Sequence, residues 1–553
     1  MRCLSPGKGL IFLWALALFT WWIRYHPPGV DLVVFDDDAR QHVYWTARFQ
    51  DPTLFRDDLL TSFISSPVFD PPGYRLLYQL GVQFMDPLPF SQLLSLALLL
   101  ISLWLLHRLS AHVIPDPRGR AFLLGLFLFF SLYDVSGGFP RSFAFPLLLL
   151  FLVLREKRAF VWAASTILIQ AVLYPPILLN SLALAGWDLF RRFIQGPRHK
   201  KWILDLLFLA AVIAVVAWLL GSVYGPGDRE IPGRQVTLQE AREMPEFHPG
   251  GRSVFFRDNP AAFLLIGRSG IGAIHLIGFA IILATMGIVA GRKALRVQSV
   301  SVHLCCTSLV LFALAHLLLF RLYLPIRYTE YTLPLAFMLA IAASTGGFLD
   351  AGKPIWARAR SALGLGRMPR WLGWGLFAAV LFVYVFLQGH VICRFDTQVV
   401  ALEPADLEML AFLKTLPKES LVAGHPVDMD NVPLLSRRRV LANRELSLPW
   451  YTKYYRQVRQ RVMDMLGVYY ARDWKEVDEF VKRYGVGALV VQRAHFQPSF
   501  LRESIYFEPF NSTIKARWEG RTGGFVLEEP PRELRCFENE RYVVLCFEKV
   551  TGR

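Results

Sequence analysis

The sequence predicts a polytopic α-helical membrane protein of about eleven spans, with a cytoplasmic N-terminus and an extracytoplasmic C-terminal domain of mixed α/β structure. Of its 553 residues, 54% are hydrophobic and only 19% are charged, whereas a soluble protein of this length would carry more charge. The apolar residues form runs of nearly membrane-span length, and Lys and Arg cluster in short loops at alternate ends of these runs. This placement accounts for the net charge of +16, so no nucleic-acid partner is expected.

The first two spans are expected at residues 10–25 and 88–106, on either side of a long outer loop at residues 26–83. The first run is expected to remain as an uncleaved span. No small-x-small cleavage site follows it, and Trp21, Trp22 and Tyr25 are typical of an interfacial aromatic belt.

Two short hairpins come next, at residues 121–154 and 160–190. The first is broken at residues 136–142 and the second at Tyr174-Pro175-Pro176. Each arm is shorter than the ~20 residues of a full span, so the arms are expected to be short or re-entrant helices. Both hairpins return to the cytoplasm, and further spans are predicted at residues 203–222, 271–290, 300–324, 334–348 and 371–390.

An outer loop at residues 223–260 completes the predicted membrane domain, residues 1–393. It is long for a structureless connection, and we expect it to close over a bound donor, with a plain solvated loop as the alternative. The three short outer turns hold only Arg141 and Arg327 as basic residues, which supports the predicted orientation.

Residues 394–553 are expected to form a soluble domain outside the cytoplasm. Helices are predicted at residues 404–416, 450–471 and 474–484, and strands at residues 420–423, 439–442, 488–492 and 542–547. The alternation predicts a mixed α/β fold. Cys536 and Cys546 could pair there, although their spacing alone does not decide it.

Three consecutive carboxylates, Asp36, Asp37 and Asp38, stand in the first outer loop. Adjacent carboxylates repel one another, so at least one pKa should be raised, and such a group can accept a proton from a hydroxyl. The alternative is a cap for a helix beginning at Ala39, which needs one Asp and not three. His42 lies four residues after Asp38 on the same helical face, so an Asp-x-Asp pair with His42 could hold a divalent cation, but no metal ligand is assigned.

This loop, the many spans, the paired short hairpins and the terminal α/β domain together resemble the GT-C superfamily of membrane glycosyltransferases. The resemblance implies a polyprenyl-phosphate or dolichyl-phosphate sugar donor and an essential Asp in the first outer loop. Aminoarabinose and protein mannosyl transferases would align on Asp37, Asp38 and Arg40. Dolichyl-phosphate-glucose transferases would align on Asp36, Asp38 and His42. Both registers use Asp38, and both families have Glu where this chain has Asp.

Transfer from such a donor releases an anionic lipid phosphate, which needs fixed positive charge and no general acid. Arg141, Arg268, Arg321 and Arg327 are candidates. Snorkelling is the alternative for Arg141 and Arg327, while Arg321 in an apolar run would be costly unless paired or functional. The predicted substrate-binding residues are Arg40, His42, Arg141, Arg321, Arg327, Tyr328 and Glu330.

We therefore predict an inverting glycosyltransferase of the bacterial inner membrane. A carboxylate of the triplet would activate a hydroxyl of an acceptor glycan, lipid or protein. The alternative is a lipid or glycan transporter or flippase, for which His275, His303 and His316 would be intramembrane relays. A nucleotide-sugar donor is not expected, because the sequence has no Gly-rich phosphate loop. The sequence does not name the sugar, the acceptor or the host.

Overall fold

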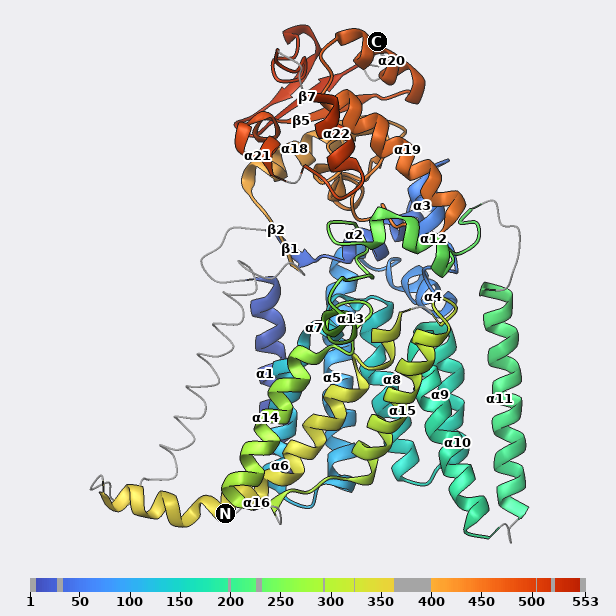
Figure 1. The fold of residues 1–553 in the computed structure, drawn as a ribbon, viewed down its shortest axis with the longest axis vertical. Coiled ribbons are helices and arrows are strands. Elements are labelled where there is room, and N and C mark those ends of the chain that lie inside the picture. The colour runs from blue at the N-terminus through green and yellow to red at the C-terminus, as the bar shows by residue number, and fades with distance from the viewer. Residues whose placement is uncertain are drawn as a thin grey trace.

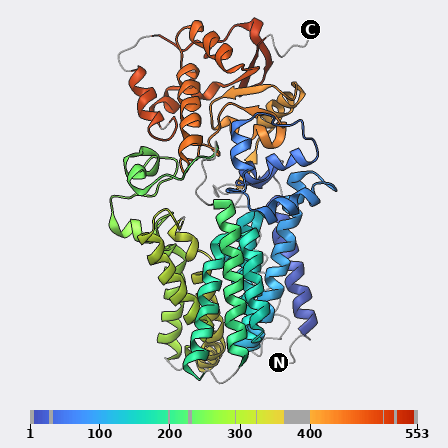
Figure 2. The ribbon, with the colours of Figure 1, turned by 90° about the vertical axis from the view of Figure 1, so that its right-hand side faces the viewer.

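The computed structural model describes residues 6–26, 33–196, 200–224, 231–291, 294–322, 324–362, 399–503, 505–518 and 523–547. These residues form three layers along the long axis of the molecule (Figure 1). A bundle of apolar helices lies at one end and an α/β domain at the other, with short helices between them. The view turned by 90° shows the same three layers (Figure 2).

The bundle consists of apolar helices, most of them close to parallel or antiparallel. They are α1 (Pro6–Tyr25), α5 (Pro87–Val113), α6 (Pro117–Phe130), α7 (Leu132–Val135), α8 (Ala144–Glu156), α9 (Phe160–Leu173), α10 (Leu178–Ile194), α11 (Lys200–Tyr224), α14 (Ala273–Ala290), α15 (Ser299–Leu317) and α16 (Thr332–Ala362). Many of their leucines, isoleucines and tryptophans are exposed, as expected for side chains that face lipid. These helices mark the chain as an integral membrane protein.

Four of the described segments are long and apolar enough to cross a membrane, or five if the pair Pro117–Phe130 and Leu132–Gly138, bent by 71°, counts as one span. The four are Pro87–Val113, Lys201–Val223, Ser299–Leu317 and Pro325–Ala351. Several predicted spans are thus shorter helices, so the total of about eleven stays a prediction. The span predicted at residues 371–390 lies outside the described residues.

The two predicted hairpins are confirmed. Between α6 and α8 the chain forms α7 and two 3-10 turns, η2 (Ser136–Gly138) and η3 (Pro140–Phe143). Gly137 and Gly138 have φ of 82° and 66°, which glycine adopts at little cost. Between α9 and α10 the chain breaks at η4 (Pro175–Ile177). Basic residues lie where α5 meets α6, where α8 meets α9 and where α10 ends, among them Arg118, Arg120, Lys157, Arg158 and Arg191, and these helix ends point away from the C-terminal domain (Figure 1).

The predicted span 300–324 is too long. Its helix, α15, ends at Leu317, so Arg321 lies in the turn that follows and not inside a helix. Phe320 explains the early end, because its ring packs against Phe247, Phe255 and Trp450 with centroid distances of 5.9, 5.0 and 5.3 Å. These partners belong to the layers outside the bundle, and the chain leaves the helix to reach them.

The middle layer comes mainly from the two long outer loops. Its elements are β1 (Val33–Asp36), α2 (Ala39–His42), η1 (Tyr44–Phe49), α3 (Leu59–Ile64), α4 (Pro72–Gly81), α12 (Leu238–Glu243), η5 (Pro245–Phe247) and α13 (Pro260–Leu265). Asp58 caps α3, since its carboxylate accepts the backbone N–H of Thr61 at 2.9 Å.

The C-terminal domain has a five-stranded mixed sheet in the order β4-β3-β5-β7-β6. The strands are β3 (Leu421–Gly424), β4 (Arg439–Val440), β5 (Ala488–Gln492), β6 (Arg535–Glu538) and β7 (Tyr542–Cys546). Strands β4, β3 and β5 are parallel, while β7 runs antiparallel to β5 and β6. The α/β prediction is confirmed, and Cys536 and Cys546 form a disulfide between β6 and β7.

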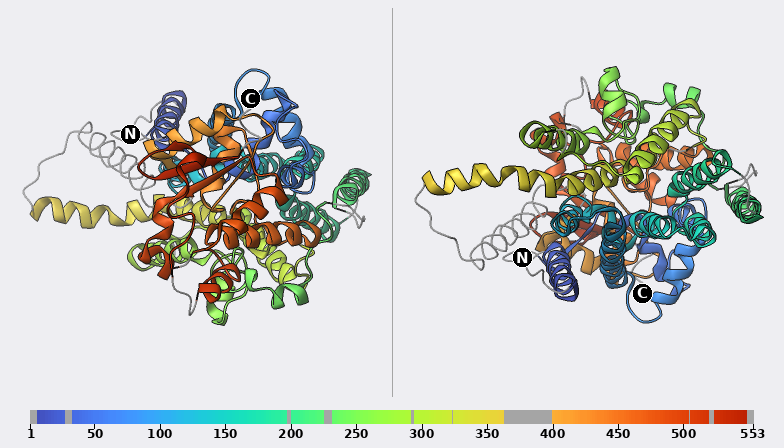
Figure 3. Two further views of the ribbon diagram at one scale, coloured as in Figure 1. Left: turned by 90° about the horizontal axis from the view of Figure 1, so that it is seen from above. Right: turned by 90° about the horizontal axis from the view of Figure 1, so that it is seen from below.

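Helices and turns surround this sheet. They are α18 (Pro404–Thr415), η8 (Asp428–Asp430), η9 (Val432–Ser436), α19 (Thr452–Tyr469), α20 (Trp474–Tyr484), η10 (Arg493–Phe496), α21 (Pro498–Arg502), α22 (Phe510–Trp518) and η11 (Arg532–Leu534). Seen from above, the C-terminal domain lies over the bundle (Figure 3). It is therefore placed to cover whatever this end of the bundle binds.

Backbone hydrogen bonds are among the contacts that tie the middle layer to the C-terminal domain. Strand β1 pairs antiparallel with β2 (Val399–Leu402), so that Asp36 lies opposite Val399. The segment 231–260 is not the plain solvated loop that was the alternative expectation, because it contains α12 and hydrogen-bonds to the C-terminal domain. Val236 donates its N–H to the Trp450 carbonyl at 3.0 Å.

Candidate functional site

Asp36 is the last residue of β1 and is buried, with 2% of its surface exposed. Its carboxylate is ion-paired with Arg24 from the last turn of α1, and it also accepts hydrogen bonds from the Tyr25 hydroxyl and from Ser136 Oγ at 2.8 Å. These donors surround the carboxylate. Asp36 therefore ties the end of α1 to the first outer loop and to η2, and it does not face an open site.

Asp37 turns the other way, toward the C-terminal domain. It pairs with Arg40 one helical turn later, and 24% of its side chain is exposed. Burial, and then the negative charge of Glu445, raise the pKa of Asp37 to about 6, against the opposing charge of Arg40. At least one raised pKa in the triplet is the behaviour that the sequence predicts.

Asp38 faces the bundle. Its Oδ2 accepts a hydrogen bond from Arg141 Nε at 2.8 Å, and 27% of its side chain is exposed. Arg141 comes from η3, the break between α6 and α8, and its guanidinium stacks over the Tyr133 ring at 4.1 Å. Arg141 Nη1 donates to the Tyr133 carbonyl at 2.8 Å, which fixes the guanidinium beside Asp38.

The charges around Asp38 keep it ionised. Burial alone would raise the pKa of Asp38, but the guanidinium of Arg141, the charge of His42 and, more weakly, that of Arg327 lower it below its ordinary value. Asp37 and Asp38 are neighbours in sequence, yet their pKa values shift in opposite directions. The difference arises because Asp38 faces cations while Asp37 faces other carboxylates.

His42 is held by an aspartate that the sequence analysis did not assign. Asp70 Oδ1 lies 2.5 Å from His42 Nδ1, and Asp70 Oδ2 accepts the Trp45 indole N–H at 2.7 Å. Burial would lower the pKa of His42, but the carboxylates of Asp70 and Asp38 raise it above its ordinary value. His42 thus adds positive charge to the Asp38 side of the loop.

Arg327 and Glu330 join the same end of the bundle. Arg327 Nη1 lies 2.8 Å from Glu330 Oε2, so Glu330 partly neutralises it. Arg327 acts electrostatically on Asp38 and also on Asp134, which in turn interacts with Arg141 and Glu330. The structure therefore gathers five predicted residues at one place: Asp38, His42, Arg141, Arg327 and Glu330.

Besides Asp36, Asp37 and Arg40, two further predicted residues do not belong to this group. Tyr328 is buried, and its hydroxyl donates to the Leu322 carbonyl at 2.8 Å, which is a packing role. Arg321 is exposed in the turn after α15, and the described residues show no ion pair or hydrogen bond between Arg321 and the residues around Asp38. The prediction that Arg321 lies within the span at residues 300–324 is wrong, because α15 ends four residues earlier, at Leu317.

Arg40 lies in a second cluster, between the loop and the C-terminal domain. Besides Asp37, it contacts Glu445 Oε1 at 3.3 Å and Asp430 Oδ2 at 3.7 Å. Glu445 also pairs with Arg252 at 3.3 Å. Burial, with the negative charge of Glu445 acting against Arg40, raises the pKa of Asp430 to about 7. We call these five residues the interdomain cluster; Asp430, Glu445 and Arg252 are too distant in sequence to be inferred from the triplet.

The cation site that the sequence suggested at Asp36, Asp38 and His42 does not form in this arrangement. Each member is already engaged: Asp36 by Arg24, Asp38 by Arg141 and His42 by Asp70. Among the described residues, the group of His, Cys, Asp and Glu side chains that could hold a metal ion lies in the C-terminal domain instead.

A scan against protein-family models finds no match, and no curated protein matches this chain. Similar solved structures include an oligosaccharyltransferase of Archaeoglobus fulgidus tethered with an acceptor peptide, with a TM-score of 0.46 and 10% identity over 93% of this chain and 72% of that chain. A second similar structure is the archaeal oligosaccharyltransferase AglB from Archaeoglobus fulgidus in complex with an inhibitory peptide and a dolichol-phosphate. Its TM-score is 0.46, and its sequence identity is 11% over 92% of this chain and 72% of that chain.

The arabinofuranosyltransferase AftD from Mycobacteria gives a TM-score of 0.47 and 12% identity over 89% of this chain, which spans only 35% of that longer protein. By their names these proteins transfer glycosyl groups, as does the superfamily that the sequence resembles. Identities of 10 to 12% and TM-scores below 0.5 do not assign an activity to this chain. The functional proposal below therefore rests on the geometry of the site.

Proposed function

We propose that this protein is an inverting glycosyltransferase that moves a sugar from a polyprenyl-phosphate donor to an acceptor hydroxyl. The observation that carries the proposal is the group around Asp38. One ionised carboxylate stands among the cationic side chains of Arg141, His42 and Arg327. Asp38 directly precedes α2, which lies between the apolar bundle and the C-terminal domain (Figure 1). In this proposal the lipid-linked donor places its phosphate at this end of the bundle.

In this proposal Asp38 is the general base. It accepts the proton of the acceptor hydroxyl as that oxygen attacks the anomeric carbon, and the bond from that carbon to the phosphate oxygen breaks on the opposite side. The departing phosphate carries negative charge, which the guanidinium groups of Arg141 and Arg327 stabilise. When the donor phosphate competes for Arg141, the pKa of Asp38 rises toward a value better suited to a base.

Two features support the membrane orientation that we propose. The helix ends rich in Lys and Arg lie away from the C-terminal domain, and such basic clusters are typically cytoplasmic. The Cys536–Cys546 disulfide fits an oxidising compartment, since disulfides are rare in the cytosol. We therefore place the site and the C-terminal domain on the outer face of the membrane, which is the periplasmic face in a bacterial host.

The transporter alternative is less well supported by the position of the charges. A transporter binds its substrate near the midplane, at broken helices. Here the charged group lies at one end of the bundle, in the layer beneath the C-terminal domain (Figure 1).

The test is transfer of labelled sugar from hexosyl and pentosyl polyprenyl phosphates by the purified chain in proteoliposomes, compared with Asp38→Asn and Asp57→Asn. Asp57 is an exposed aspartate of the same loop with φ of 53°, a conformation that Asn also tolerates, so it is a matched control. We expect transfer by the wild type and by Asp57→Asn, and a loss of ~10² or more for Asp38→Asn. Equal turnover in all three would contradict the proposal.

A further inference from the structure

Three side chains of the C-terminal domain meet at the carboxyl ends of two adjacent parallel strands. His425 directly follows β3, Asp428 begins η8 three residues later, and His495 lies in η10, the turn after β5. Strands β3 and β5 are paired so that Gly424 lies opposite Val490. Loops that leave neighbouring parallel strands converge at one edge of a sheet, which is where open α/β sheets bind ligands.

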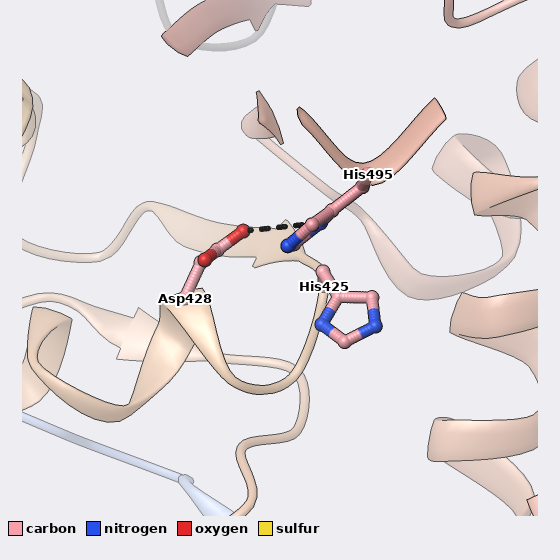
Figure 4. A group of neighbouring side chains, drawn as sticks. All are labelled: His425, Asp428 and His495. Atoms are coloured by element: carbon pink, nitrogen blue, oxygen red, sulfur yellow. Dashed lines mark ion pairs between the residues drawn. The ribbon is translucent and has the colours of Figure 1, made fainter. Parts of the chain in front are cut away.

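The geometry of these side chains is that of a ligand set. One ligand atom from each of the three lies within 4.8 Å of the others. Figure 4 shows the Asp428 carboxylate directed at the His495 ring, with the His425 ring beside both. The Asp428 Oδ2 to His495 Nδ1 distance is 3.6 Å, longer than a hydrogen bond, so the pair is not closed on itself.

His425 has polar atoms that the described residues leave unsatisfied. It is fully buried, and neither of its ring nitrogens makes a hydrogen bond of normal geometry within the described part of the chain; the Ile505 backbone contributes only a weak hydrogen-bond contact. Asp428 Oδ2 is likewise buried without a hydrogen bond to the described residues. A buried polar group without a hydrogen-bond partner lowers the stability of the fold by about 1–3 kcal/mol. Two such side chains next to each other therefore require an explanation.

We propose that His425, Asp428 and His495 bind one divalent transition-metal ion of the zinc type. Imidazole nitrogens with a carboxylate oxygen are typical zinc ligands, and a water or backbone oxygen completes a tetrahedral site. Zinc holds its ligand atoms at about 2.0–2.2 Å and therefore no more than about 4 Å apart, so the three side chains draw together on binding.

A neighbouring hydroxyl orients one ligand. The Tyr469 hydroxyl lies 3.1 Å from His495 Nδ1 and accepts the Gln492 backbone N–H at 2.9 Å. A partner on Nδ1 fixes the imidazole and leaves Nε2 for the metal, as in known metal sites. The rings of Phe500 and Tyr506 enclose His425, with centroid distances of 5.9 Å each.

The burial of the site gives the metal a structural role. The ion would join the turns after β3 and β5, and the first of these turns continues to Asp430. Asp430 Oδ1 accepts the Glu445 backbone N–H at 2.8 Å, and Asp430 faces Arg40 of the triplet loop. Metal binding therefore stabilises the surface of the C-terminal domain that contacts the middle layer, whatever reaction the protein catalyses.

The test is zinc binding by the full-length chain, purified in detergent with a tag that contains no histidine. Protein equilibrated with zinc sulfate is dialysed against metal-free buffer, and retained zinc is measured by mass spectrometry. We expect one zinc per chain for the wild type, and at least a ~100-fold loss of affinity for His425→Gln or Asp428→Asn, since loss even of an outer partner costs roughly 10–100-fold. His112→Gln, which changes an exposed histidine of α5, should retain the metal.

A measurement on the wild type alone guards against variants that fail to fold. Cobalt(II) should replace zinc and give the intense visible bands of a four-coordinate site with two nitrogen ligands, and zinc should raise the melting temperature. A wild type that retains no zinc, a six-coordinate cobalt spectrum, or retention by His425→Gln equal to that of His112→Gln would each overturn the proposal. None of these measurements depends on glycosyl transfer.

Discussion

Two charged regions, one on each side of the triplet loop, differ in the balance of their charges. Around Asp38, the charges of Arg141, His42 and Arg327 all lower its pKa, although Asp70 and Glu330 pair with His42 and Arg327. In the interdomain cluster, Asp37, Asp430 and Glu445 share Arg40 and Arg252. The pKa of Asp38 is lowered, while those of Asp37 and Asp430 are raised to about 6 and about 7.

The comparison shows that surroundings and not residue type separate two adjacent aspartates. The first region brings the cationic side chains of Arg141, His42 and Arg327 together beside one ionised aspartate, which suits the binding of a phosphate. The second holds excess negative charge inside a contact between two layers, which suits a structural contact that depends on pH. Substitutions in the first region should therefore affect activity, and those in the second should affect stability.

The largest expected effect is on Arg141. Arg141→Gln removes a guanidinium that we propose binds the departing phosphate, so kcat/KM for sugar transfer should fall by roughly 10²–10³. Arg141→Lys should retain only part of the wild-type kcat/KM, because a lysine ammonium cannot bind a phosphate through two parallel N–H groups as the planar guanidinium does. The matched control is Arg321→Gln, which changes an exposed arginine outside the group. Its kcat/KM should stay within about threefold of the wild-type value. If both glutamine variants lose activity equally, Arg141 has no special role.

Arg40 should behave in the opposite way. Arg40→Gln leaves Asp37, Asp430 and Glu445 with less neutralising charge in a buried contact, which costs about 3 kcal/mol or more. The melting temperature in detergent should fall by several degrees, at roughly 2–4 °C per kcal/mol. Activity per folded molecule should change much less than in Arg141→Gln. An unchanged melting temperature would contradict the structural role given to this cluster.

A smaller effect is expected from Asp37 as the pH changes. Its folded pKa of about 6 lies above the ordinary value of 3.8, so the folded state binds the proton more tightly. This contribution to stability is full below about pH 4 and is lost as the pH rises through about 6. Asp37→Asn should therefore flatten the fall in melting temperature between pH 5 and 8. Asp478→Asn, at an exposed aspartate of α20, should leave the fall unchanged.

The smallest effect should come from Glu330. Glu330→Gln removes the partial neutralisation of Arg327, so the donor phosphate should bind somewhat more tightly. Ion pairs of this partly exposed kind contribute about 0.2–1 kcal/mol, which corresponds to a decrease in the donor KM of roughly 1.4-fold to fivefold. A higher KM would mean that Glu330 itself binds substrate, as the sequence analysis proposed.

Local patterns allowed much of the fold to be predicted from the sequence. The breaks at Ser136–Ser142 and Tyr174–Pro176 follow from glycine and proline, and the predicted bounds of α20 and β5 agree with the structure. Local signals failed where a distant contact decides the conformation. The end of α15 is set by Phe320 and its aromatic partners in other layers.

The site could be predicted only in part, for the same reason. The three adjacent carboxylates of the triplet and the basic residue Arg141 could each be recognised from the sequence as candidate site residues. Their separate roles depend on Arg24, Glu445 and Asp70, which the fold brings to them from other segments. The sequence of three consecutive aspartates does not indicate which partner each one has in the folded protein. One contacts an arginine of α1, one lies near a carboxylate of the C-terminal domain, and one contacts an arginine of η3.

The most direct test compares Asp36→Asn, Asp37→Asn and Asp38→Asn for sugar transfer from a polyprenyl-phosphate donor, with melting temperatures measured on the same samples. We predict that Asp38→Asn loses ~10² or more in kcat while it stays folded. Asp37→Asn should stay within a few-fold of the wild type, and Asp36→Asn should mainly lower the melting temperature, because it weakens the buried pair with Arg24. A folded Asp38→Asn with wild-type turnover, or a selective loss in Asp37→Asn, would contradict the assignment of Asp38 as the base.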